Sequence, residues 1–169
     1  KVIATAGRDD SKAWVEHMGA DMVLDRTGDW KQQLGITQHG KEGLVDYILA
    51  CHEIDDMLDQ LISICKPFGH ICSIIPSTKS PMDFNTGFMK SLSFSWENMG
   101  TRAIYNADPQ LQGVVLKRLA SLVDNGVIRP WLGKTYEKAT VENLKEAHQL
   151  QESGKMIGKI AFKAEFDTV

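Results

Sequence analysis

Short apolar runs alternate along this chain with longer segments in which apolar residues recur at helical spacing. A short run of β-branched residues is typical of a buried parallel strand, and the helical period is typical of an amphipathic helix. We expect strands at 2–6, 22–24, 44–50, 70–75, 91–96 and 158–162. We expect helices at 11–18, 54–64, 110–124 and 141–153, and a loop at 76–87. Strands that alternate with helices predict an α/β fold with a parallel sheet and right-handed crossovers.

Residues with particular backbone preferences mark the ends of several expected elements. Asp10 is a candidate N-cap for the first helix, and Gly19 suits the position just after that helix. The Asp55-Asp56 pair opens the second helix, where carboxylates interact favourably with the helix dipole. Pro67 and Gly69 predict a turn into the strand at 70–75.

The composition is that of one globular domain, with 169 residues, 43% hydrophobic side chains and a formal net charge of −3. The nearly balanced charge argues against a nucleic-acid partner, and no apolar run approaches the ~20 residues that cross a bilayer. The run at 2–6 is too short for a secretion signal. Cys51, Cys65 and Cys72 are an odd number without zinc-site spacing, which favours reduced thiols, with Cys65 and Cys72 in the core. We therefore expect a cytoplasmic protein without membrane or nucleic-acid partners.

Several short motifs carry a family resemblance through their order and spacing. They are Val2-Ile-Ala-Thr-Ala-Gly7, Gly19-Ala20-Asp21 followed by Val23, Lys66-Pro67-x-Gly69, and Glu152-Ser153-Gly154 with Gly158-Lys159-Ile160. Together they make the chain resemble the C-terminal half of the medium-chain dehydrogenase/reductase superfamily. The segments 91–102, 122–129 and 143–148 are more narrowly similar to its zinc-type alcohol dehydrogenase-like branch, which is related to quinone oxidoreductases.

The resemblance implies a Rossmann-like, doubly wound parallel sheet that lacks the first strand and the glycine-rich turn. No G-x-G-x-x-G occurs in the chain, so we expect a fragment of a longer protein whose catalytic domain lies upstream. Residues 1–169 would form one partial dinucleotide-binding domain, with 127–169 returning toward the catalytic domain. The missing strand would lie between 2–6 and 44–50. These two strands would then pair directly, exchange a strand with another copy, or leave the chain marginally stable.

The expected cofactor is NADP(H). A carboxylate at the end of the second strand of a dinucleotide domain favours NAD, and the corresponding position near Ala6 carries no acid. Gly7 allows close approach of the backbone, and Arg8 offers a planar fork for phosphate, with Lys12 one helical turn later. Arg26 is a weaker third candidate. The alternative is that Arg8 and Lys12 are solvated surface charges.

Residues at the ends of later strands are candidates for the nicotinamide side of the site. Ligands of doubly wound sheets lie at the carboxyl ends of strands, which points to Cys51, His52, Ile75 and Pro76. His52 is able in principle to transfer protons, but a polar loop residue or a cofactor contact explains it better. We therefore assign no catalytic residue and no metal ligand.

The strand at 91–96 is also a candidate part of the site. The resemblance implies that Phe94, Ser95 and Trp96 lie near the nicotinamide, on a strand that pairs between the subunits of a homodimer. The alternative for these residues is core packing of a strand.

The sequence thus predicts the NADP(H)-binding portion of an oxidoreductase. Its parent would transfer hydride between nicotinamide and a small-molecule carbonyl, quinone or alcohol, and this segment alone would be inactive. The alternative is a non-catalytic α/β fragment or interaction module, because fold does not imply function.

Overall fold

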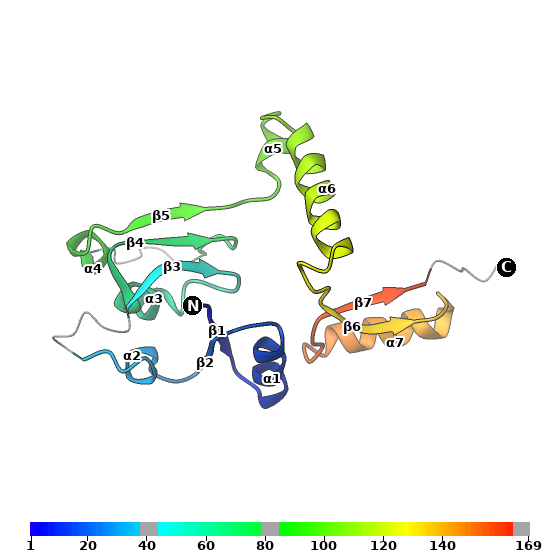
Figure 1. Ribbon diagram of the computed structural model, residues 1–169, viewed down its shortest axis with the longest axis horizontal. Helices are drawn as coiled ribbons and strands as arrows, with labels where there is room; N and C mark the ends of the chain where they lie inside the picture. Colours follow the sequence, from blue (N-terminus) through cyan, green and yellow to red (C-terminus); the bar gives the residue numbers. More distant parts are fainter. Residues whose placement is uncertain (38–43, 79–84, 164–169) are drawn as a thin grey trace.

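A computed structural model describes residues 1–37, 44–78 and 85–163, in which strands and helices alternate (Figure 1). The strands are β1 (Ile3–Ala6), β2 (Met22–Asp25), β3 (Val45–Ala50), β4 (Cys65–Ser73), β5 (Ser93–Trp96), β6 (Leu132–Tyr136) and β7 (Lys159–Phe162). The helices are α1 (Asp9–His17), α2 (Trp30–Gln33), α3 (Leu58–Ile64), α4 (Asn85–Met89), α5 (Thr101–Ile104), α6 (Gln110–Asp124) and α7 (Val141–Glu152). All strand pairs are parallel, so the predicted α/β fold is confirmed.

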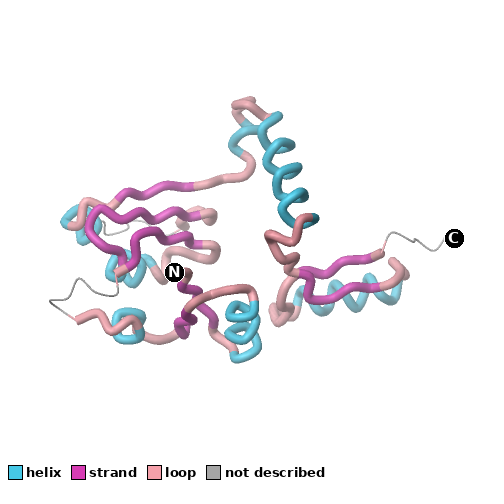
Figure 2. Tube along the Cα trace, viewed as in Figure 1, coloured by secondary structure: helices cyan, strands magenta, loops and turns pink. Residues whose placement is uncertain are grey.

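The described strands form three separate parallel sheets rather than one (Figure 2). β1 pairs with β2, β4 lies between β3 and β5, and β6 pairs with β7. Direct pairing of the strands at 2–6 and 44–50 is therefore not the outcome, since β1 and β3 belong to different sheets. β6, α7 and β7 lie together, and α6 separates them from the three-stranded sheet (Figure 1). That 127–169 returns toward another domain stays a prediction, and residues 164–169 lie outside the described part.

The predicted turn at Pro67 and Gly69 is wrong, because both residues lie within β4. The register between β3 and β4 is irregular here: Val45 is opposite Cys65, whereas Tyr47 is already opposite His70. The extra residues of β4 are accommodated by a left-handed backbone at Phe68, with a φ of 64°. A Cβ on Gly69 would approach the backbone oxygen of Lys66 to 2.8 Å. Pro67 and Gly69 thus lie at an irregularity within β4 and do not mark the start of the strand.

Two helix starts differ from the predictions. α1 begins at Asp9, with Arg8 rather than Asp10 in the N-cap position, and both aspartates lie in its first turn. The predicted role of Gly19 after this helix is supported by its φ of 109°. α3 begins at Leu58, so the Asp55-Asp56 pair does not open it.

Four short elements were not predicted, namely α2, α4, α5 and β6. α2 forms because Asp29 accepts a hydrogen bond from the Gln32 backbone at 3.1 Å and because Trp30 is buried. α4 occupies part of the expected loop at 76–87. Residues 79–84 of that loop lie outside the described residues.

The hydrophobic core lies where α2 and α3 pack beside the three-stranded sheet. Its fully buried members include Leu24, Trp30, Ile54, Cys65 and Ile71. The prediction that Cys65 is a core residue is confirmed, whereas Cys72 is half-buried and Cys51 is exposed. In the described part of the chain, no helix is long and apolar enough to span a membrane.

The central strand of the three-stranded sheet provides a test of this core. Ile71→Ala should lower the free energy of unfolding by about 2–5 kcal/mol, because it removes buried methyl groups and leaves a cavity. Ile71→Val should cost about 0.5–1.5 kcal/mol. Val141→Ala, at an exposed position, should change stability by less than about 0.5 kcal/mol. Urea denaturation measures all three, and equal losses for Ile71→Ala and Val141→Ala would contradict this core.

Candidate functional site

The carboxyl ends of β3, β4 and β5 are held in step by backbone hydrogen bonds. The Ile74 N–H donates to the Ala50 carbonyl at 3.1 Å, and the Glu97 N–H donates to the Ser73 carbonyl at 2.9 Å. Ser73 is fully buried; its Oγ donates to the Ile75 carbonyl at 2.8 Å and accepts from the Ile75 N–H at 3.2 Å. The residues that follow each strand are thus presented at one edge of the sheet.

Two of the predicted nicotinamide contacts share a cavity with Trp96. This cavity, of about 500 Å³, is lined by Ile75 and Pro76 after β4 and by Trp96 at the end of β5. Trp96 packs edge-on against Phe94, with ring centroids 4.8 Å apart. The structure therefore brings together Ile75, Pro76 and Trp96.

Ser95 has a different position. Its Oγ is 2.9 Å from Nε2 of His70 on the neighbouring strand β4, and both side chains are half-buried. Ser95 does not line the cavity of Ile75 and Pro76. Its contact with His70 supports a role in cross-strand packing, and its predicted contact with the cofactor stays a prediction.

A further cavity lies between β1 and β3. It has a volume of about 490 Å³ and is lined by three predicted site residues: Arg26, Cys51 and His52. Arg26 lies against Gly7, since a Cβ built on Gly7 would be 3.8 Å from its Nε. A guanidinium, a thiol and an imidazole thus meet around one cavity, and the strand-end Gly7 lies next to the guanidinium.

The other two predicted phosphate ligands are engaged elsewhere. Arg8 donates to Asp10 at 3.1 Å and to the carbonyls of Gly154 and Lys155 at 3.4 and 3.2 Å. Lys12 forms an ion pair with Asp25 at 3.1 Å. Among the described residues, Arg26 has no ion pair. Arg26, the weakest of the three candidates by sequence, is therefore the one that faces a cavity with its charge unneutralised.

Asp25 is a carboxylate at a strand end that the sequence analysis missed. Hydrogen bonds from the Thr27 hydroxyl and backbone, and then from Lys12, lower the pKa of Asp25 to about 2. Asp25 directly follows the strand predicted at 22–24, so its place at a carboxyl end was a usable signal. Its charge is partly neutralised by Lys12.

Asp55 is a second missed residue, which ties two loops together. It accepts hydrogen bonds from the Ser77 hydroxyl at 2.5 Å and from the Thr78 backbone and hydroxyl at 2.8 Å each. Its carboxylate therefore positions the segment after Ile75 and Pro76 rather than opening α3. The contact spans more than twenty residues of sequence, and no local pattern indicated it.

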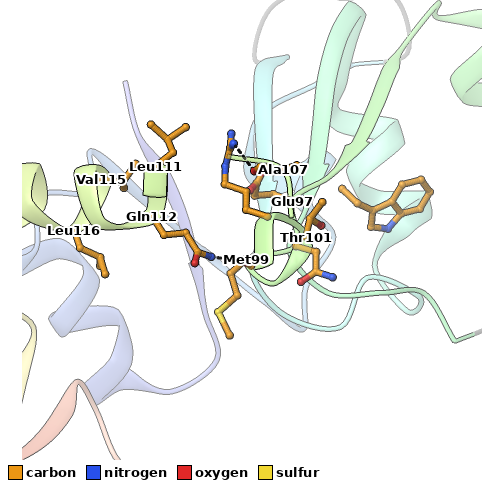
Figure 3. Close-up of a pocket in the computed structure, with 11 residues that line it drawn as sticks. Glu97, Met99, Thr101, Ala107, Leu111, Gln112, Val115 and Leu116 are labelled. Atoms are coloured by element: carbon orange, nitrogen blue, oxygen red, sulfur yellow. Dashed lines mark hydrogen bonds between the residues drawn. The ribbon is translucent and has the colours of Figure 1, made fainter. Parts of the chain in front are cut away.

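Another cavity, of about 670 Å³, lies between the end of β5 and α6 (Figure 3). Gln112 on α6 donates to the Met99 carbonyl at 2.6 Å, and Arg102 donates to the Ala107 carbonyl at 3.3 Å. Leu111, Val115 and Leu116 give its α6 wall an apolar character. Trp96 borders both this cavity and the one beside Pro76.

Zinc does not fit the side chains that the structure describes. Within 1–37, 44–78 and 85–163, no group of three or more His, Cys, Asp or Glu residues is arranged to hold a metal ion. Tetrahedral zinc needs three or four such ligands. We therefore derive no chemical step through zinc from these residues.

The low pKa of Asp25 leads to a prediction about pH. Because its folded pKa, about 2, lies below the ordinary 3.8, its charged form stabilises the fold above pH 3.8, and this contribution should disappear as pH falls to about 2. Thr27→Val should raise the pKa of Asp25, since the Thr27 hydroxyl is the largest cause of the shift. Thr27→Ser keeps a hydroxyl and serves as the control. Carboxyl NMR titration measures the pKa, and equal values in both variants would contradict the assigned cause.

Comparison with known proteins agrees with this fold. A zinc-type alcohol dehydrogenase-like protein of Staphylococcus epidermidis is 36% identical over 161 residues, which cover 95% of this chain and 47% of the relative. A protein of the same description from Staphylococcus aureus is 34% identical over 160 residues, covering 94% of this chain and 47% of the relative. The chain thus spans about half the length of the curated relatives it matches.

Solved structures show the same architecture. A proposed zinc-dependent alcohol dehydrogenase from Rhizobium etli superposes with a TM-score of 0.78 at 28% identity, over 97% of this chain and 47% of that one. A mycobacterial quinone oxidoreductase, at 18% identity, shares the fold with a TM-score of 0.70, over 95% of this chain and 48% of that one. A family profile described as zinc-binding dehydrogenase matches residues 8–161. The chain therefore belongs to the zinc-binding dehydrogenase family and corresponds to the C-terminal half of its zinc-type alcohol dehydrogenase-like members.

Proposed function

We propose that this chain is the part of an oxidoreductase that binds a nicotinamide dinucleotide. The observation that supports this function is the meeting of Arg26, Cys51 and His52 around one cavity. Arg26 directly follows β2, and Cys51 and His52 are the first two residues after β3. Carboxyl ends of strands are where doubly wound folds bind ligands. The whole protein would transfer hydride between the cofactor and a carbonyl, quinone or alcohol.

The residues present suit such a cofactor. The cavity offers a cationic fork at Arg26 and an imidazole at His52, and Gly7 lies beside the Arg26 guanidinium. On the nicotinamide side, Ile75 and Pro76 provide an apolar surface, which the hydrogen bonds of Ser73 and Asp55 hold in place. The nicotinamide supplies the hydride chemistry when bound, and this chain would bind and orient it.

We propose further that the cofactor is NADP(H). The end of β1 at Ala6 carries no acid, and Asp25 on the neighbouring strand is paired with Lys12, which reduces its repulsion of a phosphate. Arg8 donates one hydrogen bond from each guanidinium nitrogen, and two of its five N–H donors remain for a 2′-phosphate. Arg26 also lies close to Gly7, with its Nε 3.8 Å from a Cβ built on that glycine.

A homodimer is the proposed assembly of the whole protein. β5 is the outer strand of its sheet, and its end carries the exposed aromatic ring of Trp96. An unpaired edge of this kind is able to pair with a second copy. Sedimentation of the whole protein tests this, and a monomer at all concentrations would contradict it.

The first prediction from this function concerns Arg8. In the whole protein, Arg8→Ala should weaken NADPH binding by about ten- to a hundredfold, because a hydrogen bond to a charged group contributes roughly 1.5–3 kcal/mol. NADH lacks the 2′-phosphate and should bind almost unchanged. Arg118→Ala, at an exposed position on α6, is the matched control. Fluorescence titration at rising salt measures the constants, and the NADPH preference should shrink as salt screens the contact.

The same titration with Arg26→Ala separates the two arginines. If Arg26 holds the phosphate, its loss should weaken NADPH and spare NADH, as for Arg8. Equal losses of both cofactors in either variant, or no loss in both variants, would contradict NADP(H) recognition by these residues.

The second prediction is that the 169-residue chain alone has no dehydrogenase activity. It contains no G-x-G-x-x-G turn for the pyrophosphate, and a misplaced cofactor forfeits most of the rate gained from proximity. Absorbance at the NADPH band, with common quinones and aldehydes as substrates, measures turnover. Turnover by the purified chain above that of a heat-denatured sample would contradict the prediction.

A further inference from the structure

A small apolar cavity, of about 210 Å³, lies between α3, α4 and the three-stranded sheet. Ile71 on β4 and Phe94 on β5 are register partners in its wall. Each of them lies two residues before the end of its strand, so the cavity is not at the carboxyl ends, where the cofactor contacts are proposed. The described residues that line it are Ile62, Ile71, Gly87, Phe88, Leu92 and Phe94.

The lining of this cavity suits an apolar molecule and does not suit water. None of the described lining residues has a nitrogen or oxygen atom in its side chain, and a buried water needs two to four polar partners. Ile62 and Ile71 form a buried wall, whereas Phe88 is 81% exposed. A ligand would therefore enter past Phe88 and contact hydrocarbon side chains inside.

Polar contacts outside the cavity hold its walls in place. The ammonium group of Lys90, the residue after α4, lies at the C-terminal end of α3. It donates hydrogen bonds of 2.8 Å each to the carbonyls of Ile62, Ser63 and Cys65. The Leu92 N–H donates to the Gly87 carbonyl at 3.1 Å. Because hydrogen bonds from a charged donor are strong, α4 is fixed to α3 and the cavity is preformed.

Gly87 keeps space in this cavity. It is a buried residue of α4 and is not one of the glycines with a positive φ, so its backbone does not require glycine. Glycine inside a helix is less favourable than alanine. A Cβ built on Gly87 would lie 3.9 Å from Cδ1 of Ile62 and 4.0 Å from Cδ1 of Leu92, which is ordinary van der Waals contact. A methyl group would thus fit there, and its absence enlarges the cavity.

We propose that this cavity binds a single-ring aromatic hydrocarbon of the size of toluene, at a site separate from the cofactor site. An engineered apolar cavity of about 150 Å³ binds benzene, so a volume of about 210 Å³ suits one ring with a short alkyl group. Phe88 and Phe94 bring two aromatic rings to the lining, and aromatic rings pair favourably when offset or edge-to-face. A ring with a hydroxyl group would bury that group without a side-chain acceptor.

Methyl NMR titration of the whole protein tests the proposal, with toluene and phenol as the probes. Toluene should shift the methyl resonances of Ile62, Ile71 and Leu92. It should leave those of Leu111 and Val115, which line the cavity beside α6, unchanged. Phenol has nearly the size of toluene but carries a hydroxyl in place of the methyl group. It should bind about ten- to a hundredfold more weakly, because burying an unpaired hydroxyl is unfavourable.

A matched pair of glycine variants locates the site. Gly87→Ala should weaken toluene binding by about tenfold, because the added methyl group takes up space in the cavity. Gly113→Ala also replaces a glycine inside a helix, but a Cβ at this position of α6 meets nothing within 4 Å. It should bind toluene within about twofold of the original protein. Alanine favours the helix in both variants, so a difference in toluene affinity reports on the cavity.

Three results would overturn the proposal. The first is equal affinity for toluene and phenol, which would indicate unspecific partition onto the protein. The second is undiminished toluene binding by Gly87→Ala. The third is the absence of any shift at Ile62, Ile71 and Leu92 up to the solubility limit of toluene. None of these results depends on cofactor binding, which the NADPH titrations measure separately.

Discussion

The hydrogen-bonding requirement of strand edges is the constraint on which this structure depends. A strand satisfies half of its backbone groups on each edge, and buried groups left without partners are costly. Within the described residues, β1 and β3 each satisfy only one edge. Their two open edges face a cavity of about 490 Å³ lined by apolar side chains. Tyr47 and Leu49 on the β3 edge are correspondingly exposed.

The candidate site depends on the carboxyl ends of the parallel strands rather than on their edges. Backbone hydrogen bonds from Ile74 to Ala50 and from Glu97 to Ser73 keep the ends of β3, β4 and β5 in step. Ser73 is buried because its hydroxyl is satisfied by the turn that it stabilises. Asp55 then ties the following loop to the segment before α3. A cofactor contact at Ile75 and Pro76 would thus be held by hydrogen-bonded polar groups, of which Ser73 is buried, rather than by loop packing alone.

The local pattern of apolar residues predicted an element correctly where the sequence of one short segment determines its structure. The runs at 2–6, 22–24 and 44–50 became β1, β2 and β3 to within about one residue, because buried parallel strands need continuous apolar sequence. The pattern gave a wrong prediction where contacts with residues distant in the sequence determine the local structure. Pro67 and Gly69 looked like a turn, but pairing with β3 and the left-handed backbone at Phe68 keep them inside β4.

The sequence by itself determined the α/β class, the family and the strand ends at which Gly7, Cys51, His52, Ile75 and Pro76 lie, since these depend on the order of apolar runs and short motifs. Tertiary structure decided which charges are available. Arg8 and Lys12 share one helical turn and looked equivalent, yet Arg8 contacts the carbonyls of Gly154 and Lys155, and Lys12 pairs with Asp25. Arg26 alone of the three faces the cavity without an ion pair. The physical reason is that a side chain's charge is neutralised by residues far away in the sequence, which no local pattern records.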